Sequence, residues 1–173
     1  MNLIVTCSRH MEEEASDEIS KILTMLGDDE SRMEHSRFSG IVTVHTSLDP
    51  FQVVNEIRTK ILDEPWSVRY CHRFIPIQES AKATPDNIVK AVQNNMHSMQ
   101  PDDSYRITIE KRGSELSTKE LIDSIAGVVK NKVSLEKYDW NIIVEILGDI
   151  VGVSILKESD IISTLKVKRD SME

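Results

Sequence analysis

The pattern of apolar and polar positions in residues 1–75 predicts four strands and two helices. Residues 3–8 form a short apolar run that is typical of a buried strand, and residues 12–26 carry apolar side chains at helical spacing before Gly27. Residues 33–46 read as a hairpin, Asp49-Pro50 opens a second helix, and residues 66–75 form the last strand. This order predicts the split βαβ arrangement of a ferredoxin-like fold.

The pattern restarts after Pro76 and predicts a second α+β unit. Thr84-Pro85 opens a helix, residues 104–110 alternate as a half-buried strand does, and Ser117 with Glu120 forms a capping box for the next helix. Strands at 141–147 and 151–156 flank the turn Gly148-Asp149. The fold class is therefore α+β, with units at 1–75 and 76–157 that we expect to pack together, and a polar tail at 158–173.

A basic pair lies where the strand pattern of residues 104–110 gives way to the helical pattern. A helix start exposes unpaired N–H groups and the positive end of a dipole, so a phosphate can bind there, and Gly113 would let the backbone approach closely. Lys111 and Arg112 would add charge, and Arg106 shares a strand face with Arg112. The alternative interpretation is that these charges only surround a solvated sheet edge.

Charge is unevenly distributed along an acidic chain. The 173 residues are 39% hydrophobic and 29% charged, as in folded globular proteins, with a formal charge of -8. Residues 1–68 contain six Lys and Arg against thirteen Asp and Glu, residues 69–113 seven against five, and residues 114–173 eight against eleven. The middle segment alone is net basic, which permits a local anion site on an acidic protein.

No established catalytic motif is present. The first and fourth strands of a ferredoxin-like sheet are neighbours and could bring Cys7-x-x-His10 close to Cys71-His72. Their spacing is unlike that of structural zinc sites and favours two buried, inert thiols. The chain has no P-loop, GxGxxG, HExxH or GxSxG motif, so we expect neither a catalytic residue nor a cofactor. Tyr138 and Trp140, in a predicted loop, remain candidates for stacking on an unpaired base.

Neither a membrane span nor a secretory signal is expected. The longest apolar runs are far shorter than the ~20 residues that cross a bilayer. The N-terminus has no basic segment and becomes acidic at once, unlike a signal peptide. With only two cysteines, the expectation is a reduced, cytoplasmic protein.

Four segments together resemble a THUMP domain: RFIPIQ (73–78), SYRITIEKRGSELSTKELIDSIAGVV (104–129), NKVSLEKYDWNIIVEILGD (131–149) and VGVSIL (151–156). The resemblance is greatest to the stand-alone THUMP proteins that assist the tRNA cytidine acetyltransferase, and residues 1–75 resemble the ferredoxin-like unit that accompanies such domains. The chain departs from the family pattern at Ser134, where aspartate is usual, and at Tyr138, where proline is common.

This resemblance implies a non-catalytic protein that binds the acceptor stem and CCA end of tRNA and presents it to a modifying enzyme in trans, with an acetyltransferase as the expected enzyme. It implies no DNA or membrane partner. Two alternatives stay open: an accessory subunit of another tRNA-modifying enzyme, and a protein-interaction or metabolite-binding module without RNA. The expected RNA-binding residues are Arg73, Lys82, Arg106, Lys111, Arg112, Gly113, Ser114, Ser117, Lys119, Lys130 and Lys132.

Overall fold

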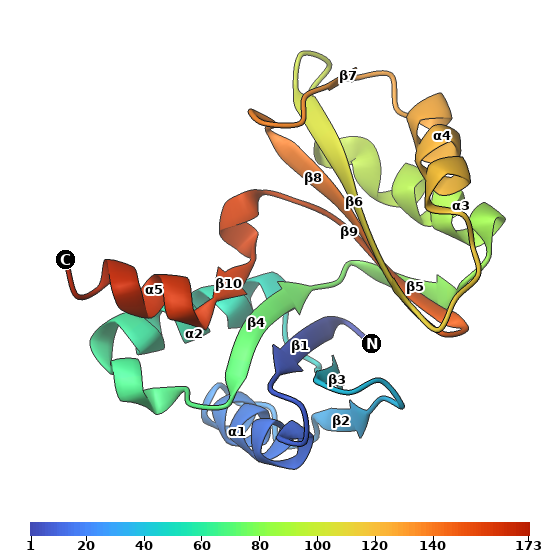
Figure 1. Ribbon diagram of the computed structural model, residues 1–173. Helices are drawn as coiled ribbons and strands as arrows, with labels where there is room; N and C mark the ends of the chain where they lie inside the picture. The colour runs from blue at the N-terminus through green and yellow to red at the C-terminus, as the bar shows by residue number, and fades with distance from the viewer. The chain divides into compact units, whose positions relative to one another are not determined.

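The chain forms two compact units. The computed structural model describes residues 1–173 (Figure 1). The first unit combines residues 1–77 with residues 159–173, and the second unit consists of residues 78–158. None of the helices has both the length and the apolar character needed to cross a lipid bilayer.

The first unit is an antiparallel sheet with three helices. Its elements are β1 (Leu3–Cys7), α1 (Glu12–Met25), β2 (Arg32–His35), β3 (Ile41–His45), α2 (Pro50–Asp63), β4 (Cys71–Pro76), β10 (Ile162–Ser163) and α5 (Thr164–Asp170). The strand order is β10-β4-β1-β3-β2, and every pair is antiparallel. The order β4-β1-β3-β2 with helices after β1 and β3 is the split βαβ connectivity that the sequence predicted.

One hydrophobic core joins α1 and α2 to a single face of this sheet. Leu3, Val5 and Phe74 from the strands pack with Ile19 and Ile57 from the helices, all almost fully buried. Helix α2 begins where the sequence predicted, because the Asp49 carboxylate accepts the N–H of Phe51 at 2.9 Å.

The C-terminal residues return to the first unit, which corrects the expectation of a tail at 158–173. Strand β10 pairs with β4, with Ile162 opposite Phe74, and Ile162 is fully buried. The Thr164 hydroxyl donates to the carbonyl of Cys71 at 2.9 Å. The segment is polar because few of its residues pack inward, and a two-residue strand leaves no periodic signal. The strand predicted from residue 66 also begins later, at Cys71.

The second unit is a mixed sheet with two helices. Its elements are β5 (Glu79–Lys82), α3 (Pro85–Asn95), β6 (Ser104–Arg112), α4 (Thr118–Val128), β7 (Lys132–Val133), β8 (Trp140–Leu147) and β9 (Ile150–Leu156). The strand order is β5-β9-β8-β6-β7, in which β6 is parallel to β7 and β8 and the other pairs are antiparallel. The short strands β5 and β7 were not predicted.

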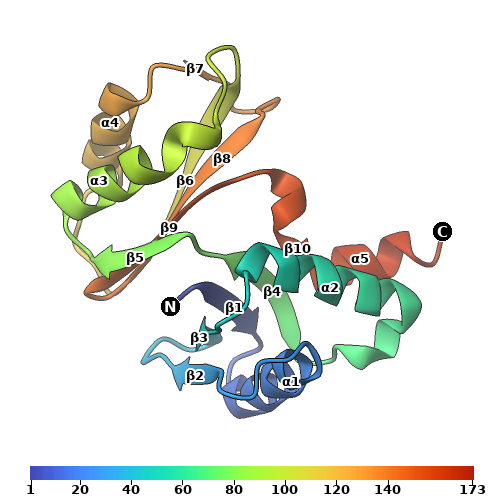
Figure 2. The same ribbon diagram turned by 180° about the vertical axis from the view of Figure 1, so that it is seen from behind.

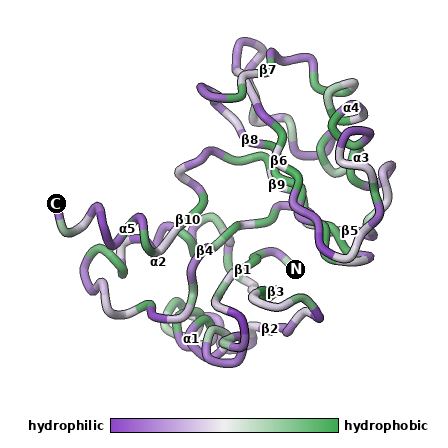
Figure 3. Tube along the Cα trace, in the orientation of Figure 1, coloured by the Kyte–Doolittle hydropathy of each residue, from purple (hydrophilic) through white to green (hydrophobic).

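Helices α3 and α4 cover the same face of the second sheet, as both views show (Figures 1 and 2). Tyr105, Val144 and Val153 of the sheet pack with Ile88 and Ile125 of the helices. Figure 3 shows hydrophobic residues along β9 and hydrophilic ones around β7. We call the covered side the helical face. The side without helices is called the open face, although Ile143, Glu145, Ser154 and Leu156 on it are buried.

The topology gives this sheet two chemically different ends. Strands β5, β6 and β8 run in one direction, so α3 and α4, which follow β5 and β6, both begin at the same end of the sheet. We call it the helix-start end. We call the opposite end, where β6, β7 and β8 begin, the β7 end. Both helices are capped as predicted, by the side chains of Thr84 and Ser117.

Candidate nucleic-acid interface

The predicted basic residues separate according to the faces and ends of the second sheet. On β6, Tyr105, Ile107 and Ile109 lie on the helical face. Because successive residues of a strand point to opposite faces, Lys111 lies on the helical face and both Arg106 and Arg112 lie on the open face. Arg106 and Arg112 stand near opposite ends of β6, about 20 Å apart at ~3.3 Å per residue.

The structure directs the side chains of Lys111 and Arg112, which the sequence suggested as one phosphate site with Gly113, to different partners. Lys111 Nζ donates to the carbonyl of Leu116 at 2.6 Å, which holds the lysine against the loop before α4. Arg112 Nη1 lies 4.0 Å from Oε2 of Glu145, a carboxylate whose side chain is only 6% exposed. The two cations therefore point to different faces, and each has a partner within the protein.

Gly113 and Ser114 shape the loop that separates the strand from the helix. Gly113 adopts φ +63, a left-handed conformation that glycine tolerates without strain, and this turn explains its identity. The Ser114 hydroxyl accepts the N–H of Leu116, and the Ser117 hydroxyl accepts the N–H of Glu120, both at 3.3 Å. Helix α4 begins at Thr118, five residues after Gly113, so the glycine itself does not adjoin the helix start. The side chain of Lys111 does reach it, because Nζ bonds the carbonyl of Leu116, one residue before the N-cap Ser117.

At the helix-start end, the turn between β8 and β9 brings two distant predicted residues into one row. Gly148 donates its N–H to the carbonyl of Arg112, and Ala83 donates its N–H to the carbonyl of Asp149, both at 2.8 Å. Lys82, Ile150, Leu147 and Arg112 follow one another across the sheet. Lys82 and Arg112 thus share the open face about 14 Å apart, three strand spacings of ~4.8 Å. Lys119 lies close to this end, in the first turn of α4.

At the β7 end, a cation and an aromatic ring stack. The guanidinium of Arg106 lies 5.4 Å from the ring centroid of Tyr138, a cation–π distance. Arg106 Nη1 also lies 3.4 Å from the carbonyl of Leu135. Lys132 is paired with Ser104, two residues before Arg106, so both cations are on the open face of neighbouring strands. We call Arg106, Lys132 and Tyr138 the Arg106 platform.

Glu158 fixes the ring of this platform in place. The Tyr138 hydroxyl donates to Glu158 Oε2 at 2.7 Å, and this bond is the main reason that the pKa of Tyr138 is raised. Neither Arg106 nor Lys132 forms an ion pair. Lys132 is exposed, whereas Arg106 is half-buried and its Nε atom is buried without a hydrogen-bond partner. Lys130 follows α4 near the same end and interacts only weakly with the carbonyl of Gly127, at 3.5 Å.

The nearby carboxylates Asp103 and Asp139 are occupied by structural hydrogen bonds. Asp103 Oδ2 accepts the N–H of Gln100 and the indole N–H of Trp140, each at 2.8 Å, and these bonds lower the pKa of Asp103. Asp139 Oδ2 accepts the N–H of Ser104 at 2.9 Å. The ring of Trp140 is covered by Lys157, whose Nζ lies 5.2 Å from its centroid. Both aromatic candidates therefore adjoin a cation, Tyr138 with Arg106 and Trp140 with Lys157.

The structure brings together only part of the predicted set. Arg73 lies on β4 of the first unit, exposed beside its partners Thr6 and Ser163, and is not part of the second sheet. The pairing of Arg106 with Tyr138 was missed, although both residues had been singled out separately. The two residues are 32 positions apart in the sequence. Their contact depends on the register between β6 and β8, so no local pattern predicts it.

The cysteines and histidines of the first unit are not arranged as a metal site. Cys7 and Cys71 face each other across β1 and β4 and are buried, and burial is the main cause that raises the pKa of each thiol. The structure has no group of three or more His, Cys, Asp or Glu side chains that could hold a metal ion.

Comparison with known proteins identifies the second unit. Residues 78–156 match the family model of the THUMP domain, which confirms the predicted domain in this part of the chain. THUMP domains are associated with tRNA binding in tRNA-modifying enzymes. No curated protein sequence matches the chain significantly.

Solved structures share the fold of both units at low sequence identity. PH1313 from Pyrococcus horikoshii matches with a TM-score of 0.69 at 15% identity, over 91% of this chain and 55% of its own. TrmN from Thermus thermophilus matches with a TM-score of 0.55 at 11% identity, over 90% of this chain and 45% of its own. A 4-thiouridine synthetase bound to RNA and ATP matches with a TM-score of 0.53 at 8% identity, over 91% and 42%. The chain thus spans about half the length of these proteins.

Proposed function

We propose that this protein is a non-catalytic, cytoplasmic adaptor that binds the acceptor stem and CCA end of tRNA and presents the tRNA to a separate modifying enzyme. The observation that carries the proposal is the THUMP domain at residues 78–156. Residues 73–156 resemble stand-alone THUMP proteins that assist the cytidine acetyltransferase. This resemblance supports acetylcytidine as the nucleoside that the partner enzyme forms. The likeness in fold to a synthetase in complex with RNA is consistent with this role.

We assign RNA contact in the second unit to the Arg106 platform rather than to the basic pair at Lys111. Arg106 and Lys132 have no carboxylate partner, and Tyr138 adds an aromatic surface beside them. Cations that neutralise phosphates and rings that stack on unpaired bases are the two elements of single-strand recognition. Arg112, by contrast, lies 4.0 Å from the carboxylate of Glu145. Lys111 donates to the carbonyl of Leu116 at 2.6 Å, a shorter bond than the 3.4 Å from Arg106 to the carbonyl of Leu135.

Titration of tRNA at several salt concentrations tests this assignment. The double variant R106A/K132A should bind tRNA more weakly, and its log-log salt slope should be flatter by about 0.7 to 0.9 for each phosphate that the variant no longer neutralises. A matched control, K21A/K90A, removes two exposed helix lysines and should leave the slope unchanged. An unaltered affinity in folded R106A/K132A contradicts the platform. Absence of any salt-sensitive complex with the wild-type protein contradicts the function and favours a module without RNA.

Nucleoside analysis of tRNA from cells that lack the protein tests the choice of enzyme. Loss of acetylcytidine alone is expected. Loss of another modified nucleoside instead identifies an accessory subunit of a different tRNA-modifying enzyme. A reaction of tRNA with a group donor in the presence of the purified protein alone would overturn the non-catalytic role.

A further inference from the structure

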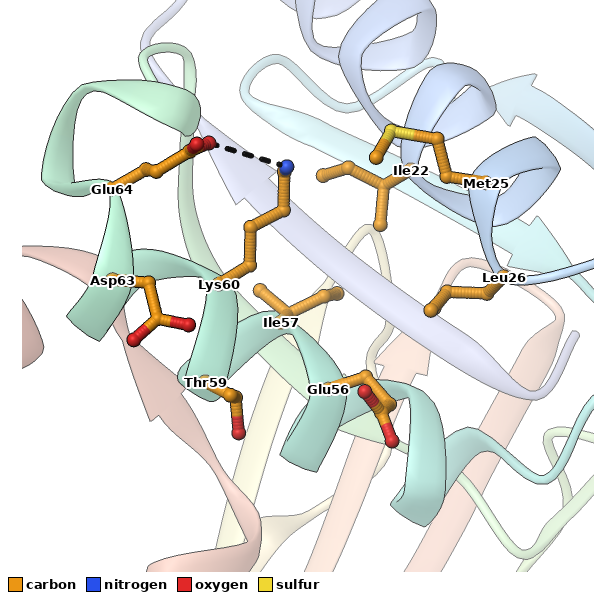
Figure 4. A pocket seen from close by; sticks show the side chains of 9 residues that line it. All are labelled: Ile22, Met25, Leu26, Glu56, Ile57, Thr59, Lys60, Asp63 and Glu64. Atoms are coloured by element: carbon orange, nitrogen blue, oxygen red, sulfur yellow. Dashed lines mark ion pairs between the residues drawn. The ribbon is translucent and has the colours of Figure 1, made fainter.

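A groove in the first unit lies between the end of α1 and the length of α2. One hollow of about 310 Å³ is lined by Ile22, Met25 and Leu26 at the end of α1 (Figure 4). On the α2 side its lining consists of Glu56, Ile57, Thr59, Lys60, Asp63 and Glu64. A second hollow of about 300 Å³ reaches the start of α2 and shares Met25, Leu26 and Glu56 with the first. Because they share these residues, the two hollows adjoin each other, and we call them together the groove.

The floor of this groove is apolar and open to solvent. Ile22 and Ile57 belong to the buried core, whereas Met25 is 69% exposed and Leu26 and Leu48 are half-buried. Figure 4 shows the side chains of Leu26 and Ile57 directed into the space between the two helices. Methionine is flexible and adapts to differently shaped partners, so an exposed Met25 suits a recognition surface.

The rim of the groove is acidic. Glu56, Asp63, Glu64 and Asp49 line it, and all four side chains are exposed. Lys60 is the one cation in the lining, and its Nζ lies 3.6 Å from Glu64. Glu56 and Asp63 form no ion pair. An apolar floor with uncompensated carboxylates above it is complementary to apolar side chains flanked by Lys or Arg.

We propose that this groove binds a basic amphipathic helical segment of a protein partner. Phosphates of nucleic acid and of anionic lipids would be repelled by the rim, which leaves a cationic polypeptide as the complementary occupant. An amphipathic helix places apolar side chains at i, i+3, i+4 and i+7 into such a groove and keeps its charges at the rim. The inference deepens the proposed function, because an adaptor that presents tRNA needs a surface for its enzyme.

Fluorescence anisotropy with a labelled helical peptide tests the groove. The probe is a 14-residue peptide with Leu at i, i+3, i+4 and i+7 on one face and Lys elsewhere, and a scrambled peptide of the same composition is the reference. The helical peptide should bind the full chain more tightly than the scrambled one. E56K/D63K should weaken its binding about tenfold, because two rim carboxylates become cations. M25S should weaken it without any change of charge.

A charge-matched control separates the groove from the general acidity of the unit. E13K/D17K makes the same change of charge on exposed positions of α1 outside the groove and should weaken peptide binding less than threefold. Equal weakening in E56K/D63K and E13K/D17K overturns the proposal. Equal binding of the helical and the scrambled peptide, or peptide binding that M25S does not change, also overturns it. Circular dichroism confirms that each variant is folded.

Two further measurements keep this inference distinct from the proposed function. tRNA binding should be the same in E56K/D63K as in E13K/D17K, so a selective effect of the groove variant on tRNA overturns a protein occupant. Sedimentation of the wild-type chain should show no self-association through the groove. Self-association that E56K/D63K abolishes would identify a second copy of the chain as the occupant. Failure of tRNA to bind the wild type, with peptide binding intact, overturns the tRNA role alone.

Discussion

Glu18 binds three consecutive backbone N–H groups, those of Arg69, Tyr70 and Cys71. Oε2 of Glu18 accepts the N–H groups of Tyr70 and Cys71, each at 3.0 Å. Helical periodicity alone cannot show that a distant loop reaches Glu18. We expect E18A to lower the free energy of unfolding by about 2 kcal/mol, because three backbone donors lose their acceptor. Urea denaturation measures it, and D17A, an exposed neighbour, should change it by less than ~0.5 kcal/mol.

We expect Asp28 to make the stability of the first unit depend on pH. Its carboxylate is 3% exposed and accepts bonds from the Thr46 hydroxyl and the N–H groups of Ser47 and Glu30, and the Thr46 bond is the main cause of its lowered pKa. A carboxyl with a lower pKa in the folded state stabilises the protein above its unfolded pKa of about 3.9 and loses this contribution as pH falls through the folded pKa.

The variant D28N should therefore be less stable than the wild type at neutral pH, and the difference should shrink as the pH falls below about 4. Urea midpoints measured from neutral to acidic pH give the comparison, with D29N as an exposed control that should follow the wild type. A difference between wild type and D28N that stays constant with pH would show that the Asp28 charge is not what stabilises the unit.

Among the elements, the C-terminal segment contributes more to the first unit than its polarity suggests. Ile162 of β10 is fully buried against β4, while Leu165, three residues later in α5, is 72% exposed. I162A should lower the free energy of unfolding by about 2 to 4 kcal/mol, because it leaves a cavity in the core. L165A should have little effect on the same thermal or urea denaturation curve. Similar small effects of both would indicate that β10 is not docked in solution.

The elements that the sequence predicted are those with a strong local signal. Thr84-Pro85 and Ser117 fixed the starts of α3 and α4, and the alternation at residues 105–109 fixed β6. Strands β5, β7 and β10 have four residues or fewer and depend on pairing with distant strands, so they left no period to detect. The arrangement of the candidate site was only partly predictable for the same reason. Period two separates Lys111 from Arg112, but only the register between β6 and β8 brings Glu145 beside Arg112 and Tyr138 beside Arg106.

For the whole molecule, a formal charge of -8 must weaken long-range attraction to RNA. Much of that charge is on α1, where Glu13, Glu14 and Asp17 are exposed. Glu12 differs, because its Oε1 accepts the N–H of Gly40 at 2.7 Å and so holds the loop before β3. A variant that changes electrostatics without disturbing the fold must therefore spare Glu12 as well as Glu18.

Neutralising the exposed acidic face in E13Q/E14Q/D17N should strengthen tRNA binding about threefold at 50 mM salt, because three repulsive charges are removed. The gain should nearly disappear at 300 mM salt, since screening shortens the range of the repulsion to less than the ~10 Å of 0.1 M salt. Anisotropy titrations of labelled tRNA at both concentrations measure the effect. If the variant instead loses affinity for a basic protein while its tRNA binding stays the same, the acidic face of α1 is itself a protein contact rather than a source of repulsion that directs RNA to the second unit.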